Sequence, residues 1–317
     1  MPLSLDFAFE GFRIIREKPK LILFWGLVLL IGGTLAEVLM VAIAGPDIER
    51  MQALGPARMM ALMANATPDS GVLSMVRNIT VAMAVAAPIL LITSAILSCA
   101  VFRATWIQGG GQIGSMGGAK VSDRFGYLRV GADEARQLVV TVLYYLIGLV
   151  LLLAVSILAG IIASVAGGAA PAVAAALSLA GLVVAFLVLV RLSLCMVQSF
   201  DRKTIDLFGS WSLTAKQGWT LLGGYIVTGV MVAFVYILCS GIFGAVVVAI
   251  NGAQFATVDH LVRTDSTSLQ AYFTPMTIAS TLIGNLLVSP LLVALTTGAQ
   301  AAAYRTLAGH VADPGVF

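Results

Sequence analysis

Charge is scarce in this sequence. Only 10% of its 317 residues are Asp, Glu, Lys or Arg, whereas 60% are hydrophobic, and the mean hydropathy is +1.01. A soluble globule of this size needs far more charge to cover its surface. The composition therefore excludes a soluble globular protein and predicts an integral membrane protein. The net charge of +3 gives no support to nucleic-acid binding.

Cysteine and histidine are also scarce, with 3 and 2 residues. Cys99, Cys195 and Cys239 lie within or at the ends of apolar runs, too far apart in sequence for a recognisable metal motif. We interpret them as packing residues. His260 stands beside Asp259, but no nucleophile motif accompanies the pair, which favours a solvated loop. The sequence thus predicts no catalytic residues, no metal ligands and no cofactor.

Long apolar runs are what the sequence does contain. A hydrocarbon core of roughly 30 Å requires about 20 apolar residues per helix, and six stretches reach that length. They run roughly from Leu21 to Ala44, Ile79 to Phe102, Leu138 to Ala163, Ala172 to Val190, Leu221 to Ile250 and Ile278 to Ala303. Segments of about ten residues that alternate apolar and polar side chains, typical of membrane barrels, are absent. We predict an all-α polytopic membrane protein with six transmembrane helices in one integral membrane domain over residues 1–317.

The positions of Lys and Arg predict the orientation, because cytoplasmic loops are enriched in both. If both termini are cytoplasmic, the outer side holds only Arg50, Arg58, Arg77 and Arg263. The sequence therefore predicts cytoplasmic N- and C-termini.

Three segments with a similar layout precede apolar runs, at residues 8–20, 124–137 and 204–219. In the first, an apolar helical face that includes Phe12 and Ile15 lies opposite a charged face, so we expect an amphipathic helix in the headgroup plane that ends at Pro19. It either anchors the helix bundle or docks a partner. In the third, Thr204 is the expected N-cap.

The second and sixth apolar runs correspond to each other. The interval from Pro88 to Arg103 equals that from Pro290 to Arg305, and polar positions coincide between them. Together with the three amphipathic segments, this predicts pseudo-repeats of two spans each, at about 4–103, 124–191 and 204–305, and a possible three-fold arrangement.

Glu37 is the only acidic residue inside an apolar run, and ionisable residues in membranes suggest function. We expect it either to pair with Arg77 or to relay protons. The sixth run carries polar residues on one helical face, which serve either interhelical hydrogen bonds or a polar cavity. The candidate polar transmembrane positions are Glu37, Arg77, Ser94, Ser98, Asn285, Ser289, Thr296 and Gln300.

Basic and tryptophan side chains gather where the runs are expected to meet the cytoplasm. The candidate cytoplasmic interface comprises Arg103, Arg191, Trp211, Lys216, Trp219 and Arg305. On the opposite side, residues 45–78 are rich in Met, which indicates either an outer-leaflet surface helix or a contact with lipid or a lipoprotein.

The stretch FGSWSLTAKQGW, Phe208 to Trp219, resembles a family of bacterial six-span inner-membrane proteins that share a Ser-Trp-x-Leu-Thr segment. FGYLRVGADEARQL, Phe125 to Leu138, is similar to the companion segment of the alphaproteobacterial members. This family is similar to the membrane domain of some glycerophosphodiester phosphodiesterases, whose catalytic barrel is a separate domain that we do not expect in this sequence. The resemblance implies a polytopic fold in the bacterial cytoplasmic (inner) membrane and implies no activity.

We therefore expect a non-enzymatic inner-membrane protein that acts as a scaffold or accessory factor in lipid or envelope handling. Its expected partners are membrane lipids and another membrane or envelope protein. The alternative is a transporter of small solutes or lipids that uses the polar faces of the second and sixth spans. A membrane-embedded enzyme is the third hypothesis, since no His, Cys or carboxylate cluster is expected at one depth.

Overall fold

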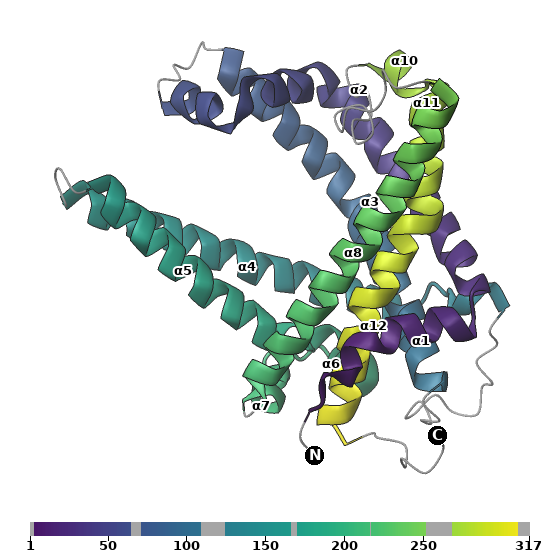
Figure 1. Cartoon of the computed structure of the whole chain (residues 1–317). Helices are drawn as coiled ribbons and strands as arrows, with labels where there is room; N and C mark the ends of the chain where they lie inside the picture. The colour runs from purple at the N-terminus through teal and green to yellow at the C-terminus, as the bar shows by residue number, and fades with distance from the viewer. Residues whose placement is uncertain are drawn as a thin grey trace. The chain divides into compact units, whose positions relative to one another are not determined.

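The structure is a computed structural model that describes residues 3–64, 71–108, 124–165, 170–215, 217–251 and 268–309 (Figure 1). These residues are almost entirely helical, and no strand occurs among them. The longer helices are α1 (Glu10–Glu17), α2 (Lys20–Ala64), α3 (Gly71–Gln108), α4 (Ala132–Val165), α5 (Ala170–Leu192), α6 (Cys195–Arg202), α8 (Gly218–Asn251), α11 (Pro275–Ile283) and α12 (Ser289–Leu307). The short elements are η1 (Leu5–Phe9), η2 (Arg124–Tyr127), α7 (Gly209–Thr214), α10 (Leu269–Tyr272) and the π-helical turn η5 (Gly284–Val288).

Among the described residues, six stretches of helix are long and apolar enough to cross a membrane. They are Lys20–Gly55, Gly71–Trp106, Phe125–Ile162, Ala172–Arg202, Gly218–Val246 and Thr277–Leu307. Each one contains most of a predicted apolar run, so the prediction of an all-α, six-span polytopic protein is confirmed. Most extend beyond the predicted run, because backbone hydrogen bonding continues the helix after the side chains turn polar. The chain is a multi-pass membrane protein.

The chain divides into two compact units. Unit 1 comprises Met1–Glu17, Ser98–Gly229 and Ala294–Phe317, and unit 2 comprises Lys18–Leu97 and Val230–Val293. Helices α3, α8 and α12 contribute residues to both units. The predicted pseudo-repeats follow a different division, by position along the chain, and stay a prediction.

The core of unit 1 gathers aromatic and aliphatic side chains from both ends of the chain. Rings of Phe102 and Phe200 lie 5.4 Å apart between centroids, and those of Trp106 and Tyr304 lie 6.1 Å apart. These four side chains are all at least 97% buried, so they stabilise the unit through both apolar area and ring contacts. The rest of the buried cluster consists of Leu3, Phe7, Cys99, Val190, Leu194, Val197, Leu221, Ala299, Ala301 and Ala303.

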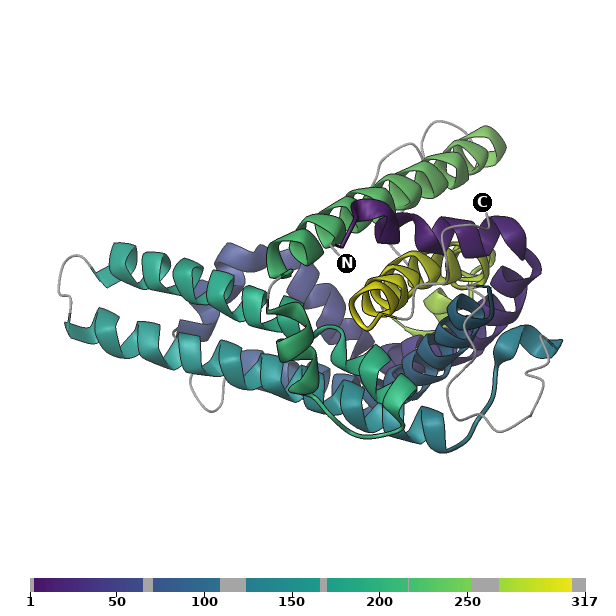
Figure 2. The ribbon, with the colours of Figure 1, turned by 90° about the horizontal axis from the view of Figure 1, so that it is seen from below.

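Helix α1 packs across the part of α12 that belongs to unit 1 (Figure 1 and Figure 2). A Cβ atom at Gly11 would lie 2.5 Å from the Cα of Leu295, so only glycine permits this approach. The buried side of the segment carries Phe7, Gly11 and Ile14, whereas Phe12, which we expected on that face, is 38% exposed. The predicted apolar face is therefore shifted, because the position of α12 decides which residues are covered.

Helices α4 and α5 form an antiparallel pair within unit 1 (Figure 2). A Cβ atom at Gly181 would lie 2.4 Å from a methyl group of Val155, and the Tyr144 hydroxyl donates to the carbonyl of Leu189 at 3.2 Å. This close approach agrees with the Ala and Gly content of the two runs. Large side chains on the pair, such as Leu153 and Phe186, are more than half exposed, as membrane-facing side chains are.

Two of the predicted amphipathic segments differ from expectation in their local structure. Residues 124–137 form no separate helix, because η2 is followed by α4, which runs without a break into the membrane span. In the third segment α7 begins at Gly209, so Thr204 is not an N-cap. The N-cap position is Phe208, and the first N–H of α7 is bound by Asp206 instead. One carboxylate oxygen of Asp206 accepts the backbone N–H of Gly209 at 2.8 Å, and the other accepts from Gln198 at 2.9 Å.

Unit 2 is built around glycines of α2 that lie against neighbouring helices. A Cβ atom at Gly26 would lie 2.1 Å from the carbonyl oxygen of Leu286, and one at Gly32 would lie 2.2 Å from the hydroxyl of Thr93. At Gly33 the added atom would lie 3.1 Å from the Asn285 carboxamide. Small residues allow helix backbones to approach closely in membranes, and here they place α2 directly against η5 and α3.

The sixth predicted span is not one uniform helix. It consists of α11, the π-helical turn η5 and α12, and the backbone N–H of Ser289 donates to the carbonyl of Gly284, five residues earlier. Pro290 follows directly and has no N–H to donate, so the widened turn adapts the helix to the missing hydrogen bond. Such single π turns occur frequently at functional sites.

Helix α2 changes direction after its membrane span. Gly55 has φ 70° and ψ 163°, a backbone conformation that glycine adopts readily, and Pro56 follows it. The helix continues to Ala64 and holds Met59, which is 8% exposed. This region is helical as expected, while its place at an outer leaflet stays a prediction.

Candidate functional site

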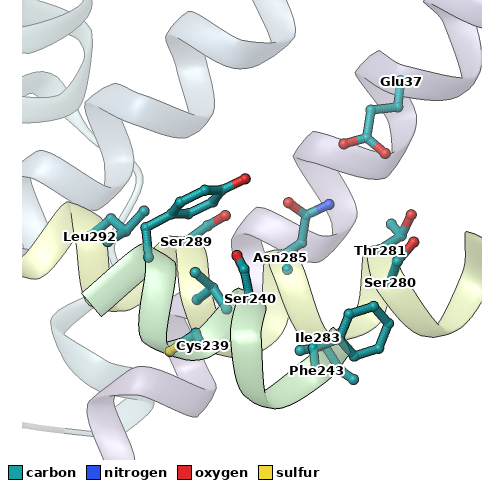
Figure 3. Close-up of a pocket in the computed structure, with 13 residues that line it drawn as sticks. Glu37, Cys239, Ser240, Phe243, Ser280, Thr281, Ile283, Asn285, Ser289 and Leu292 are labelled. Carbon is teal, nitrogen blue, oxygen red and sulfur yellow. The ribbon is translucent and has the colours of Figure 1, made fainter. Parts of the chain in front are cut away.

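A pocket of about 300 Å³, lined by both polar and apolar side chains, lies within unit 2. Its wall is formed by α2, α8, α11, η5 and the first turn of α12, all within segments that are apolar enough to span a membrane. In Figure 3, Ser240, Asn285 and Ser289 are grouped together, with Glu37 beyond Asn285. The lining residues are Glu37, Tyr236, Cys239, Ser240, Phe243, Ser280, Thr281, Ile283, Gly284, Asn285, Val288, Ser289 and Leu292.

Glu37 is held by a tyrosine and not by the arginine that we expected. The hydroxyl of Tyr272 donates to its carboxylate at 2.7 Å, and Tyr272 itself is 3% exposed. No ion pair joins Glu37 to Arg77, which is exposed on α3, so that predicted pair is wrong. The reason is that α10 brings Tyr272 against α2. Burial raises the pKa of Tyr272 to about 12, and the hydrogen bond to the Glu37 carboxylate adds to the rise.

Asn285 lies on the π-helical turn, next to α2. Its carboxamide is close to Gly33, which precedes Glu37 by four residues, so Gly33 and Glu37 share one face of α2. Glycine at 33 leaves the space that the carboxamide fills. Asn285 on η5 and Glu37 on α2 thus both line the pocket. The Asn285 carboxamide offers a hydrogen-bond donor and an acceptor, and Glu37 offers a carboxylate.

The pocket unites some of the predicted polar positions and excludes others. Glu37, Asn285 and Ser289 line it. Ser94, Ser98, Thr296 and Gln300 do not, and Ser94 and Thr296 are exposed. The predicted polar face of the sixth span is therefore only partly a pocket wall, because the wall ends at Leu292.

Several pocket residues escaped the sequence analysis. Tyr236 and Ser240 lie one turn apart on α8, and Thr281 lies one turn before Asn285. Their helical spacing was available as a signal, but single hydroxyl groups are common in apolar helices and only the pairing of helices shows which ones converge. Cys239 lines the pocket and is partly exposed, whereas Cys99 and Cys195 are buried as packing residues.

The chemistry of the pocket is that of a binding site for hydrogen-bond donors. The described residues that line it include one carboxylate, several hydroxyl groups, one carboxamide and one thiol, and no Lys, Arg or His. A partly buried carboxylate without a basic neighbour among these residues favours a ligand that donates hydrogen bonds or carries positive charge. The apolar side chains of Phe243, Ile283 and Leu292 provide contact for a hydrocarbon portion.

The predicted interface residue Arg103 is buried in unit 1, with only 1% of its surface exposed. Its guanidinium donates to Glu134 at 2.5 Å and to the carbonyl of Tyr127 at 3.2 Å. Tyr127 has a φ of 61°, so this hydrogen bond holds a backbone turn that a non-glycine residue rarely adopts. The prediction of Arg103 as a surface contact is therefore wrong, because the first turn of α4 covers its side chain.

The remaining interface candidates that the structure describes lie in two places within unit 1. Arg305 is largely buried, with 13% of its side chain exposed, and donates to the carbonyl of Thr105 at 3.0 Å. Arg191, Trp211 and Trp219 line a common pocket. Lys216 lies outside the described residues.

Comparison of the chain with protein families, with curated proteins and with solved structures found no match. The resemblance to bacterial six-span proteins therefore stays an expectation.

Proposed function

We propose that this protein is a non-enzymatic membrane protein that binds an amphiphile, such as a membrane lipid, in the unit 2 pocket as part of lipid or envelope handling. The observation that carries the proposal is the convergence of Glu37, Asn285 and Ser289 on one cavity within membrane-spanning segments. Polar and ionisable groups at such positions are expensive to bury. Their convergence on one cavity favours a ligand that completes their hydrogen bonds.

The composition of the wall supports an amphiphile in particular. A headgroup with N–H or O–H donors matches the Glu37 carboxylate and the serine and threonine oxygens, while Phe243 and Leu292 match a hydrocarbon chain. Binding is favoured over catalysis because, in the part of the chain that the structure describes, the pocket wall holds no histidine or second carboxylate to act with Glu37 as an acid and base pair.

Native mass spectrometry of protein released gently from its own membrane tests this function. We expect a defined amphiphile to be retained by the wild type and lost in the double variant Glu37→Gln/Asn285→Leu. Ser94→Leu is the matched control, because Ser94 is an exposed polar residue of α3 outside the pocket. Equal retention by all three proteins, or a retained protein partner without any lipid, would contradict the proposal and favour a scaffold.

Transport is the second candidate, and the π-helical turn is the observation that favours it. Helix interruptions beside polar pockets are where transporters bind substrates and coupling ions. In this version Glu37 couples flux to protons or cations. Glu37→Gln would abolish flux in reconstituted vesicles while binding persists, whereas a pure binding protein shows no flux in either form.

The location in a bacterial cytoplasmic membrane with both termini cytoplasmic is part of the proposal and rests on the distribution of Lys and Arg. Cysteine substitutions for labelling can be placed at two exposed serines: Ser4 near the start of the chain and Ser74 near the start of α3. An impermeant maleimide should label Ser74→Cys in intact spheroplasts and Ser4→Cys only after permeabilisation. The reverse pattern contradicts this orientation.

A further inference from the structure

We propose that unit 1 holds a second site, formed by Arg191, Trp211 and Trp219, that binds one anionic phospholipid. This inference is independent of the proposed function, because it concerns other residues and another unit. The site is a pocket of about 330 Å³ between the end of α5, α7 and the start of α8. It is lined by Val184, Leu187, Val188, Val190, Arg191, Trp211, Ala215, Gly218 and Trp219.

The guanidinium of Arg191 is the only charged group among the described residues that line the site. It stacks over the ring of Trp211, with 4.9 Å between its central carbon and the ring centroid. None of the residues that line the pocket is acidic, and no carboxylate of the described chain lies within ion-pair distance of Arg191. The stacking fixes the guanidinium plane and leaves its N–H groups to a negatively charged ligand, for which a phosphate is well suited.

An apolar stripe leads from Arg191 along α5. Val184, Leu187 and Val188 precede it by seven, four and three residues, the spacing of one helical face. Seven residues of helix correspond to about 10 Å, enough to contact much of an acyl chain. These residues belong to a span that is apolar enough to cross a membrane, so the surface meets lipid. A headgroup on Arg191 and an acyl chain on the stripe describe one phospholipid.

The two tryptophans complete the match to a lipid at the membrane surface. Trp219 is 78% exposed and Trp211 is 39% exposed, large fractions for such apolar rings. Trp is enriched at membrane–water interfaces, where its ring lies among headgroups. Basic side chains at the ends of transmembrane helices bind anionic headgroups there. The charge distinguishes this site from a general lipid contact, because a zwitterionic lipid gains much less from Arg191.

The test is a lipid titration of the full chain in detergent, followed by native mass spectrometry. Phosphatidylglycerol and phosphatidylcholine with identical acyl chains are the probes. We expect tighter binding of phosphatidylglycerol to the wild type, weakened roughly fivefold in Arg191→Gln. Arg129→Gln is the matched control: Arg129 is exposed, lies outside the pocket and carries the same charge, so the substitution should leave binding unchanged. Trp219→Ala should weaken both lipids.

Two further measurements test the role of Arg191 and the identity of the anion. Arg191→Lys keeps the charge and loses the planar stacking, so we expect an intermediate affinity even if Arg191→Gln does not fold. Inorganic phosphate is added as a competitor, since a site for the free anion would release phosphatidylglycerol at millimolar phosphate. Equal affinity of the wild type for both lipids, equal effects of the two Arg→Gln substitutions, or displacement by phosphate would overturn the proposal.

Discussion

The hydroxyl oxygen of Tyr272 lies 2.7 Å from a carboxylate oxygen of Glu37, although the two residues are 235 positions apart in the chain. This hydrogen bond joins α10 to the middle of α2 and places a phenol beside Glu37, the only acidic side chain among the described residues that line the unit 2 pocket.

Removing the hydroxyl group of Tyr272 should destabilise unit 2 by a modest amount. Tyr272→Phe deletes a hydrogen bond to a charged group, which contributes about 1.5–3 kcal/mol when fully buried. Glu37 is only partly buried, so we expect a loss of about 1 kcal/mol in the free energy of unfolding. Unfolding in a mild detergent, followed by circular dichroism, measures it. Tyr145→Phe is the control, because Tyr145 is 59% exposed. An equal loss of unfolding free energy in both variants would show that the hydrogen bond to Glu37 does not stabilise the protein.

The same contact predicts a pH dependence at alkaline pH. The pKa of Tyr272 is raised to about 12, first by burial and then by the Glu37 carboxylate. A raised pKa means that this residue's stabilising contribution is fully present below the ordinary tyrosine pKa of about 10 and is lost as the pH rises through 12. Tyrosinate absorbance near pH 11 should therefore be higher in Glu37→Gln than in the wild type. No difference between them would mean that the carboxylate does not act on the phenol.

Deleting Arg103 should be among the most damaging single changes in unit 1. It would leave Glu134, which is 5% exposed, as an unpaired buried charge and would release the Tyr127 carbonyl. Breaking a buried ion pair on one side costs about 3–5 kcal/mol. We expect Arg103→Met to unfold at much lower temperature and Arg103→Met/Glu134→Leu to recover most of the loss. Arg136→Met, which removes a partly exposed pair with Asp133, should cost about 1 kcal/mol or less.

The close approach of α2 to η5 predicts the effect of adding a single methyl group. Gly26→Ala would place Cβ 2.1 Å from the Leu286 carbonyl oxygen, which belongs to the backbone and cannot rotate away. Overpacking of this kind costs about 1–3 kcal/mol. Gly160→Ala is the control, since nothing lies within 4 Å of its added Cβ and the helix should become slightly more stable. The thermal unfolding temperatures of both variants measure these effects. An unchanged unfolding temperature in Gly26→Ala would show that α2 and η5 can move apart to accept the methyl group.

The membrane spans could be predicted from the sequence because their cause is local. A run such as Leu221 to Ile250 has no other way to bury its side chains and satisfy its backbone than a helix across a bilayer. The helical character of all six runs is therefore confirmed. Glu37, Asn285 and Ser289 could be selected for the same reason, since polar residues stand out in apolar runs and need polar surroundings.

The partners of those residues were decided by tertiary structure. The position of Arg77 at the outer start of the second span suggested it as the partner of Glu37, but α10 supplies Tyr272. Arg103 pairs with Glu134 and is buried, so it is not presented at a surface. Which side chains meet depends on how each helix is rotated and how closely two helices approach, and both depend on packing at single glycines such as Gly26 and Gly33. The sequence by itself determined that this is a six-span helical membrane protein. Only the packing of its helices decided which side chains converge on the unit 2 pocket.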